Sequence, residues 1–300
     1  MPDLDFAVKY PFSSDAKEAV SGIEVTDEIV EKAVGLILSA MVDNVRTKQY
    51  LSDEEKKEDV AAYAVARMIL GAMRNRYVTG KFAVAIAKLT RRNLNQESEE
   101  KLKRISAMFG IRSRDDEVFI VDYLRFSPKE PHYALLTRKL NKGWVKITDS
   151  EKKRLIEEAV RKHVEHIPLV KNPSKAVKDA ILRIEKELPR REQKIVPKLE
   201  EHPPCVSHLL DEIKKHHNLP HHARWFLAVY LIEQGLSNDE IVALYSNLPD
   251  FEEKKTRYQI EHARKRGYTV PSCATIASYG ICVANCGISS PTKWRGKRNE

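Results

Sequence analysis

The sequence has few cysteines and tryptophans, and it has no long apolar run. Four cysteines in 300 residues are too few for a disulfide-rich secreted fold. The longest apolar run near the C-terminus, Trp225 to Ile232, has eight residues, whereas a membrane span needs ~18. The first residues also lack the basic and apolar segments of a secretory signal. With 42% hydrophobic residues the chain is too apolar for general disorder, so we expect an intracellular globular protein with no membrane partner.

Positive charge is concentrated in the middle of the chain. The net charge is +9, and residues 101–200 hold 25 Lys and Arg against 15 Asp and Glu, while residues 1–100 hold 14 against 17. A basic segment is typical of proteins that meet a polyanion such as nucleic acid, although a solvated surface rich in Lys and Glu gives the same composition.

The pattern predicts a mostly α fold with two domains. The first 110 residues read as helical, with helix starts at Thr26 and at Ser52, where Glu55 completes a capping box. A small antiparallel sheet is expected between about 115 and 148, within an α/β subdomain at about 110–150. Its strands are expected in the β-rich runs 118–121, 133–136 and 144–147. Further helices are expected at 149–166 and from Ser174 to about 188.

A proline-rich, charged stretch predicts the domain boundary. Four prolines fall between residues 189 and 204. The predicted organisation is a helical N-terminal domain at 1–190, a linker at 191–204 and a helical C-terminal domain at 205–300.

The cysteines are the strongest chemical signal in the C-terminal domain. Cys205, Cys273, Cys282 and Cys286 are separated by 67, 8 and 3 residues. Four thiols match the ligand number of an iron–sulfur cluster, whose cysteine spacing varies. Zinc is an alternative, because six histidines lie between residues 202 and 222, but the paired C-x2-C spacing of structural zinc sites is missing. Disulfides are disfavoured in a reducing cytosol.

One predicted helix carries cations and an aromatic ring on the same face. In residues 252–266, the i, i+4 spacing places Lys254, Tyr258 and His262 in line, with Lys265 and Arg266 following. Cations that neutralise phosphates, next to an aromatic that stacks on a base, are typical of single-stranded nucleic-acid sites. A solvated helix of mixed charge would have the same pattern. The helix predicted at 225–236 follows His221, His222 and Arg224, whose histidines have a simple alternative role at the helix start.

Evidence for catalysis is thin. The sequence has no phosphate-binding G-x-x-x-x-G-K-[ST] loop and no hydrolase G-x-S-x-G motif. Asp3 and Asp5 form a D-x-D pair that resembles a two-metal site, but no strand precedes them to hold them rigid. We therefore expect no catalytic residues.

The blocks between the cysteines resemble those of a known family. Residues 219–226 (LPHHARWF), 256–262 (TRYQIEH), 268–273 (YTVPSC) and 280–287 (GICVANCG) are similar in order and spacing to the C-terminal domain of the DNA primase large subunit of archaea and eukaryotes. The rest of the chain resembles the archaeal form more loosely, including the Tyr10-Pro11-Phe12 start. One departure is the apolar Trp225-Phe226-Leu227 after Arg224, where eukaryotic forms favour polar residues and tyrosine.

The resemblance implies a cofactor, partners and site residues. It implies a [4Fe-4S] cluster ligated by the four cysteines, in a non-catalytic subunit that partners the small catalytic primase subunit. It leaves open whether a further subunit joins the complex. It also implies that the chain helps to start RNA primers from nucleotides on single-stranded DNA. The residues that match the family's contacts to template, primer or nucleotide are Arg224, Tyr258 and His262, and His221 is a weaker match. Lys254, from the helix face described above, and Arg257, from the TRYQIEH block, complete the predicted nucleic-acid-binding set.

Two other functions remain open from the residues themselves. One is a stand-alone iron–sulfur enzyme acting on nucleic acid, such as a nuclease or glycosylase. The other is a zinc-stabilised nucleic-acid adaptor. For a primase subunit we expect a cytoplasmic, nucleoid-associated location in an archaeon and a nuclear location in a eukaryote.

Overall fold

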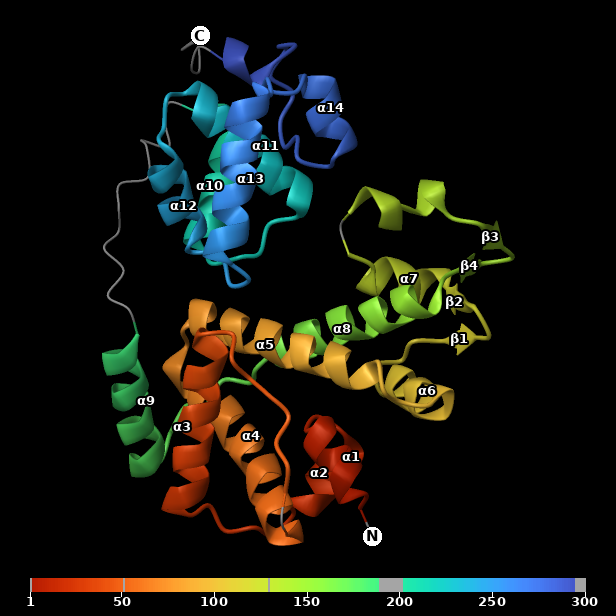
Figure 1. Ribbon diagram of the computed structural model, residues 1–300, viewed down its shortest axis with the longest axis vertical. Helices are drawn as coiled ribbons and strands as arrows, with labels where there is room; N and C mark the ends of the chain where they lie inside the picture. Colours follow the sequence, from red (N-terminus) through yellow and green to blue (C-terminus); the bar gives the residue numbers. More distant parts are fainter. Residues whose placement is uncertain (1, 51, 129, 189–201, 295–300) are drawn as a thin grey trace. The chain divides into compact units, whose positions relative to one another are not determined.

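The chain forms two compact units, Met1–Pro189 and Arg190–Glu300. The computed structural model describes residues 2–50, 52–128, 130–188 and 202–294 (Figure 1). Each unit has its own hydrophobic core. Most of the predicted linker at 191–204 falls outside the described residues. The described part of the chain is mostly helical, with one small sheet. None of the described helices combines the length and the apolar character that a membrane span requires.

The N-terminal unit begins with helices that start where the capping residues predict. The Thr26 hydroxyl accepts a hydrogen bond from the Ile29 N–H, and Ser52 accepts one from Glu55 N–H. The first six helices are α1 (Leu4–Lys9), α2 (Ser14–Ala19), α3 (Asp27–Met41), α4 (Asp53–Met73), α5 (Arg76–Leu94) and α6 (Glu99–Met108). Both predicted helix starts are confirmed.

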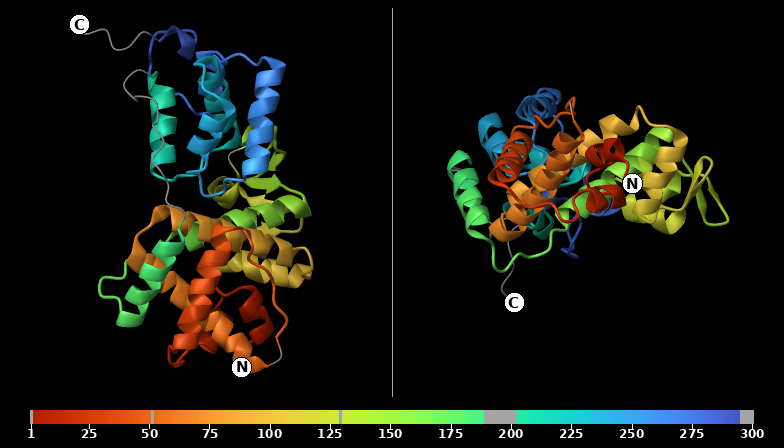
Figure 2. Two further views of the ribbon diagram at one scale, coloured as in Figure 1. Left: turned by 60° about the vertical axis from the view of Figure 1, so that its left-hand side comes forward. Right: turned by 90° about the horizontal axis from the view of Figure 1, so that it is seen from below.

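Long helices supply the core of this unit. Helix α8 (Asp149–Glu165) begins with a complete capping box between Thr148 and Glu151, and α9 (Lys175–Glu187) begins after Ser174, both as predicted. Helix α5 packs along α8, while α3 packs on α4 and α9 (Figure 2). Phe82, Ile37 and Ile69 are fully buried where these helices meet.

The small sheet is antiparallel, with strand order β1-β2-β4-β3. Its strands are β1 (Ser113–Arg114), β2 (Glu117–Phe119), β3 (Leu140–Asn141) and β4 (Trp144–Lys146), and α7 (Ile120–Phe126) follows β2 directly. Only the runs at 118 and 144 are therefore confirmed as strands. The strand expected at 133–136 is wrong, because this segment forms the 3-10 turns η1 (Pro131–Tyr133) and η2 (Leu135–Thr137). Leu136 is 98% exposed, so no sheet neighbour covers its β-prone side chain.

The C-terminal unit is helical throughout its described part. Its helices are α10 (Pro204–Lys214), α11 (His221–Glu233), α12 (Asn238–Tyr245), α13 (Glu253–Arg266) and α14 (Cys273–Ser278), and a 3-10 turn η4 (Pro291–Lys293) follows. Helix α11 contacts α10, α12 and α13. It starts at His221 rather than at the predicted Trp225. Pro220 occupies the N-cap position, and the residue after it is the first residue of the helix.

Gly71 in α4 provides a test of how this unit is packed. A Cβ atom at this position would lie 2.5 Å from the Pro168 carbonyl oxygen in the segment after α8. We expect Gly71→Ala to destabilise the unit by about 1–3 kcal/mol, since backbone must move. Urea unfolding and hydrogen exchange of α4 and α8 would measure this loss. The matched control is Gly35→Ala in α3, which meets no atom within 4 Å and should stabilise by about 0.5–1 kcal/mol. Equal behaviour of the two variants would contradict the packing.

Candidate metal centre and nucleic-acid face

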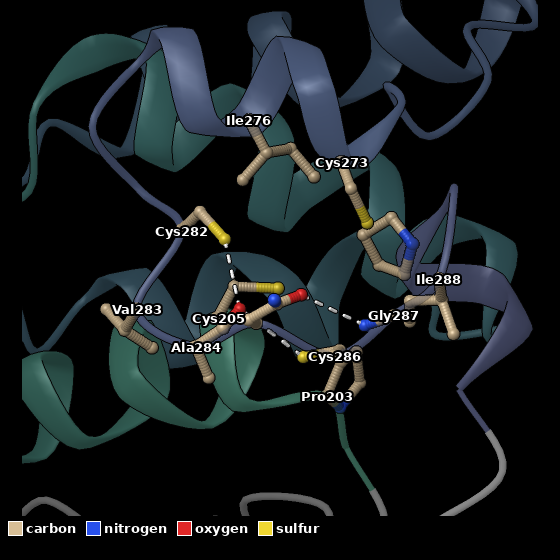
Figure 3. A pocket seen from close by; sticks show the side chains of 12 residues that line it. Pro203, Cys205, Cys273, Ile276, Cys282, Val283, Ala284, Cys286, Gly287 and Ile288 are labelled. Carbon is tan, nitrogen blue, oxygen red and sulfur yellow. Dashed lines mark hydrogen bonds between the residues drawn. The ribbon is translucent and has the colours of Figure 1, made fainter.

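All four cysteines line one cavity in the C-terminal unit. The cavity has a volume of about 450 Å³, and its walls include Pro203, Ile276 and Pro291 besides the cysteines. The sulfur atoms of Cys205, Cys273, Cys282 and Cys286 point toward the same space in Figure 3. No described histidine lines the cavity. The structure thus brings together the four residues that the sequence singled out, and it leaves out the neighbouring histidines.

Helix starts position the first two cysteines. Cys205 lies in the first turn of α10, just after Pro203 and Pro204, whose fixed φ suits a helix N-terminus. Cys273 is the first residue of α14, where the Ser272 hydroxyl accepts the Thr275 N–H at 3.2 Å. Both cysteines therefore lie at helix starts, whose positive partial charge lowers the pKa of a thiol, but burial outweighs this effect and raises the pKa of both.

A tight loop positions the other two cysteines. Gly280 (φ 68°) and Gly287 (φ 63°) adopt left-handed backbone conformations on either side of Cys282 and Cys286. Both thiols donate to the same acceptor, the Ala284 carbonyl, with sulfur–oxygen distances of 3.3 and 3.6 Å. The loop therefore holds both sulfurs close to one atom.

The surroundings of the thiols disfavour the charged thiolate form as long as no positive charge lies nearby. Burial raises the pKa of the Cys205 thiol to about 11, with a further contribution from Cys273 and Cys286. Burial and the neighbouring thiols also raise the pKa values of Cys273 and Cys286. A positively charged group in the cavity would reverse this balance and stabilise the thiolates.

The donor set fits a polynuclear centre. All four cysteines are free thiols. A single tetrahedral zinc ion would draw its sulfur ligands to within about 4 Å of one another, given Zn–S bonds of about 2.3 Å. Among the described residues, no three His, Cys, Asp or Glu side chains are arranged to hold one metal ion. Four free thiols that line one cavity match the ligand number of an iron–sulfur cluster.

The exposure and the pKa values predict an order of thiol reactivity in metal-free protein. Cys282 is exposed, whereas Cys205 is 9% exposed and has a pKa of about 11. Because thiolate is the nucleophile, iodoacetamide at pH 8 should modify Cys282 first and Cys205 last. Peptide mass spectrometry over time would measure the order. Urea-unfolded protein is the control, in which the difference should vanish, and faster reaction of Cys205 in the folded chain would contradict the geometry.

The predicted helix face exists on α13. Lys254 is exposed, and Tyr258 is 66% exposed. The Tyr258 ring stacks on His262 with a centroid distance of 6.0 Å and an interplanar angle of 26°. Lys265 and Arg266 are exposed at the C-terminal end of the same helix. We call Lys254, Tyr258 and His262 the α13 face.

Two aromatic residues that the sequence analysis missed extend the α13 face. Tyr268 lies edge-on to His262 at 6.1 Å, and Trp225 of α11 lies edge-on to Tyr268 at 5.9 Å. Tyr268 is 44% exposed. The sequence signal that could have placed Tyr268 is Gly267, a residue that often ends a helix in the left-handed conformation. Here Gly267 ends α13 in this way, and the Tyr268 N–H donates to the Ala263 carbonyl. Four rings therefore form one aromatic row.

The structure separates the two candidate arginines from the α13 face. Arg257 pairs with Asp239 at 2.6 Å and with Glu253 at 3.3 Å, so it faces α12. Arg224 pairs with Asp250 at 2.6 Å and donates to the Leu219 carbonyl at 2.8 Å. Both guanidinium groups are thus engaged within the unit.

His221 and the D-x-D pair also find definite places. His221 is exposed at the first position of α11, and His222 beside it contacts the Tyr279 ring at 4.6 Å. In the N-terminal unit, Asp3 accepts the Phe6 N–H as the N-cap of α1, and Asp5 pairs with Lys56 at 2.9 Å. The two aspartates therefore serve a helix start and a surface ion pair.

Comparisons with known proteins agree with these features. The family model described as the C-terminal domain of the eukaryotic and archaeal DNA primase large subunit matches residues 197–296. The DNA primase large subunit PriL of Halobacterium salinarum is 32% identical across 92% of this chain and 87% of its own length. PriL of Archaeoglobus fulgidus is 34% identical across 78% of this chain and 67% of its own length. PriL of Methanosarcina acetivorans is 31% identical across 93% and 83%.

The chain belongs to the DNA primase large-subunit family, of the archaeal type.

Proposed function

We propose that this chain is the regulatory, non-catalytic large subunit of a DNA primase. In this role it stabilises and modulates a small catalytic subunit and helps to initiate RNA primers on single-stranded DNA at the nucleoid. The observation that carries the proposal is its similarity to PriL proteins over most of both chains. The structural use of Asp3 and Asp5, the one carboxylate pair considered for nucleotidyl transfer, agrees with a non-catalytic role.

The α13 face is proposed to hold template or primer strand. Lys254 supplies a cation for a phosphate, and the exposed Tyr258 ring supplies a surface for a base. Stacking does not depend on base identity, which suits a protein that must start primers on many sequences. The ring of His262 stacks on the ring of Tyr258, and this contact restricts the orientation of the tyrosine side chain before a ligand binds.

The cysteine cavity is proposed to hold a [4Fe-4S] cluster ligated by Cys205, Cys273, Cys282 and Cys286. When bound, such a cluster would crosslink segments that are distant in sequence and supply positive charge to the thiolates. The chain's own contribution is to aim four thiols into one cavity and to hold the loop at Ala284. The zinc-stabilised adaptor is less consistent with the absence of paired C-x2-C spacing among the four cysteines.

Substitution of one ligand tests the cluster. Cys282→Ser should lower the iron and sulfide content and the visible absorbance of anaerobically purified protein. Because the centre ties Cys205 to Cys273, amides of α10, α11 and α14 should lose hydrogen-exchange protection, while α3–α5 keep theirs. Val283→Ser is the matched control, since it alters the same exposed loop without removing sulfur. Wild-type iron content in Cys282→Ser would remove this residue from the ligand set.

Two substitutions on the α13 face test nucleic-acid binding by the full-length chain. Tyr258→Ala should weaken binding of a single-stranded oligonucleotide by about 1–3 kcal/mol with an unchanged salt dependence, and Tyr258→Phe should retain binding. Lys254→Ala should flatten the slope of log affinity against log salt by about 0.7, the value for one phosphate contact on a single strand. Fluorescence anisotropy across a salt series measures both effects. Wild-type binding by folded Tyr258→Ala and Lys254→Ala proteins would reject the face.

A further inference from the structure

A second group of aromatic rings lies where α11 begins. The His222 ring lies edge-on to the Tyr279 ring at 4.6 Å, and it also lies edge-on to the His221 ring at 5.7 Å. Tyr279 is the C-cap residue of α14, and it is 39% exposed. The nucleic-acid-binding set predicted from the sequence includes His221 but neither His222 nor Tyr279. We call His222 and Tyr279 the α14 pair.

The first turns of α11 connect the α14 pair with the aromatic row. Trp225, the last ring of the row, lies three positions after His222 and four after His221, so these side chains share one side of the helix. His221 is exposed, and His222 and Trp225 are partly exposed. Aromatic side chains therefore follow one another over the unit from Tyr258 on α13 to Tyr279 at the end of α14.

The start of α11 is also suited to phosphate groups. Its first turn holds no acidic residue, and the N-terminus of a 13-residue helix carries a positive partial charge. Arg224 lies in this turn. Its contacts within the described part of the chain engage Nε and Nη2, so Nη1 stays open toward an anion. A strand that stacks on both groups of rings would carry its phosphates past this positive region.

We propose that the α14 pair is a second stacking site for single-stranded nucleic acid, so that one strand runs from the α13 face across the start of α11 to Tyr279. This proposal rests on the proposed function of the α13 face. The ligand is a strand of several nucleotides, because only a continuous strand joins the two groups of rings. Each ring stacks on a base of any identity. Two linked contacts bind more tightly than either one alone, since the second forms within the complex.

The length of the strand tests this proposal in the full-length, cluster-loaded chain. Fluorescence anisotropy across a salt series would compare single strands of about 4 and about 12 nucleotides, which fall within the usual range of site sizes. Tyr279→Ala should weaken binding of the long strand by at least about fivefold, the loss of one stacked base, with the wild-type salt slope. The short strand should lose less than about twofold, because the α13 face alone holds it. Tyr258→Ala should weaken binding of both strands.

Conservative and matched variants separate the loss of the ring from damage to the fold. Tyr279→Phe keeps the ring and should rescue binding of the long strand. Val283→Ser alters an exposed side chain four residues after Tyr279 and should bind both strands as the wild type does. Iron content and hydrogen exchange of α14 confirm that each variant is folded, since Tyr279 precedes Cys282 by only three residues.

Base fluorescence locates the two ends of the strand independently. The fluorescent base 2-aminopurine loses emission when it stacks on an aromatic ring. With this base at either end of the long strand, the wild-type chain should quench both positions. Tyr258→Ala should restore emission at one end, and Tyr279→Ala should restore it at the other. The wild-type measurement carries the test even if the Tyr279 variants lose iron.

Three results would overturn the proposal. Equal losses for the short and the long strand in Tyr279→Ala would show a structural role for this residue. Quenching at one end only would show that no base reaches Tyr279. Loss of nucleoside triphosphate binding in Tyr279→Ala, with wild-type binding of the long strand, would assign the ring to a free nucleotide.

These results are distinct from failure of the proposed function. In each of them the α13 face stands, provided that Tyr258→Ala and Lys254→Ala weaken binding. If the wild-type chain binds no single-stranded DNA, the proposed function itself fails, and the second stacking site fails with it.

Discussion

Six consecutive residues of α11, Phe226 to Leu231, are buried, and successive residues of a helix point 100° apart. This helix is therefore covered on every side, and no single neighbour can provide that cover. Helices α10, α12 and α13 share the task, and Cys205, Ile276 and Ile281 join the same apolar cluster. The need to surround α11 thus decides where the cysteine cavity and the α13 face both lie.

The cations of helix α13 lie on two sides of the helix, one that packs toward α12 and one that faces solvent. On the side toward α12, Arg257 pairs with Asp239, and Arg264 donates to Asn238 and to the Leu236 carbonyl. On the outer side, Lys254 and Lys265 are exposed beside Tyr258. One ion pair and two hydrogen bonds hold this side of α13 toward α12 and the turn before it, while Lys254 and Lys265 stay exposed to solvent. The number of basic residues in α13 is therefore larger than the number that its outer side exposes.

The sequence predicts local features well and long-range ones poorly. Helix starts at Thr26, Ser52 and Thr148 depend on groups three residues away, so capping patterns suffice to find them. The strand predicted at 133–136 is wrong because the prediction used β-propensity alone, and no neighbouring strand covers this segment. Arginine partners such as Asp250, 26 residues from Arg224, have no spacing signal at all. For the cysteines, the sequence supplied their number and chemistry, and the fold supplied their convergence.

The cysteine cavity and the aromatic row share one short connection. Tyr268, the ring that links α13 to α11, precedes Cys273 by five residues. The Cys273 N–H donates to the Ser289 carbonyl at 3.0 Å, which anchors α14 to the loop of Cys282 and Cys286. A cofactor held by all four thiolates would fix Cys273 relative to Cys205, and it would limit the positions open to Tyr268 because the connection is short. Such a cofactor would therefore link the geometry of the aromatic row to the state of the cysteine cavity.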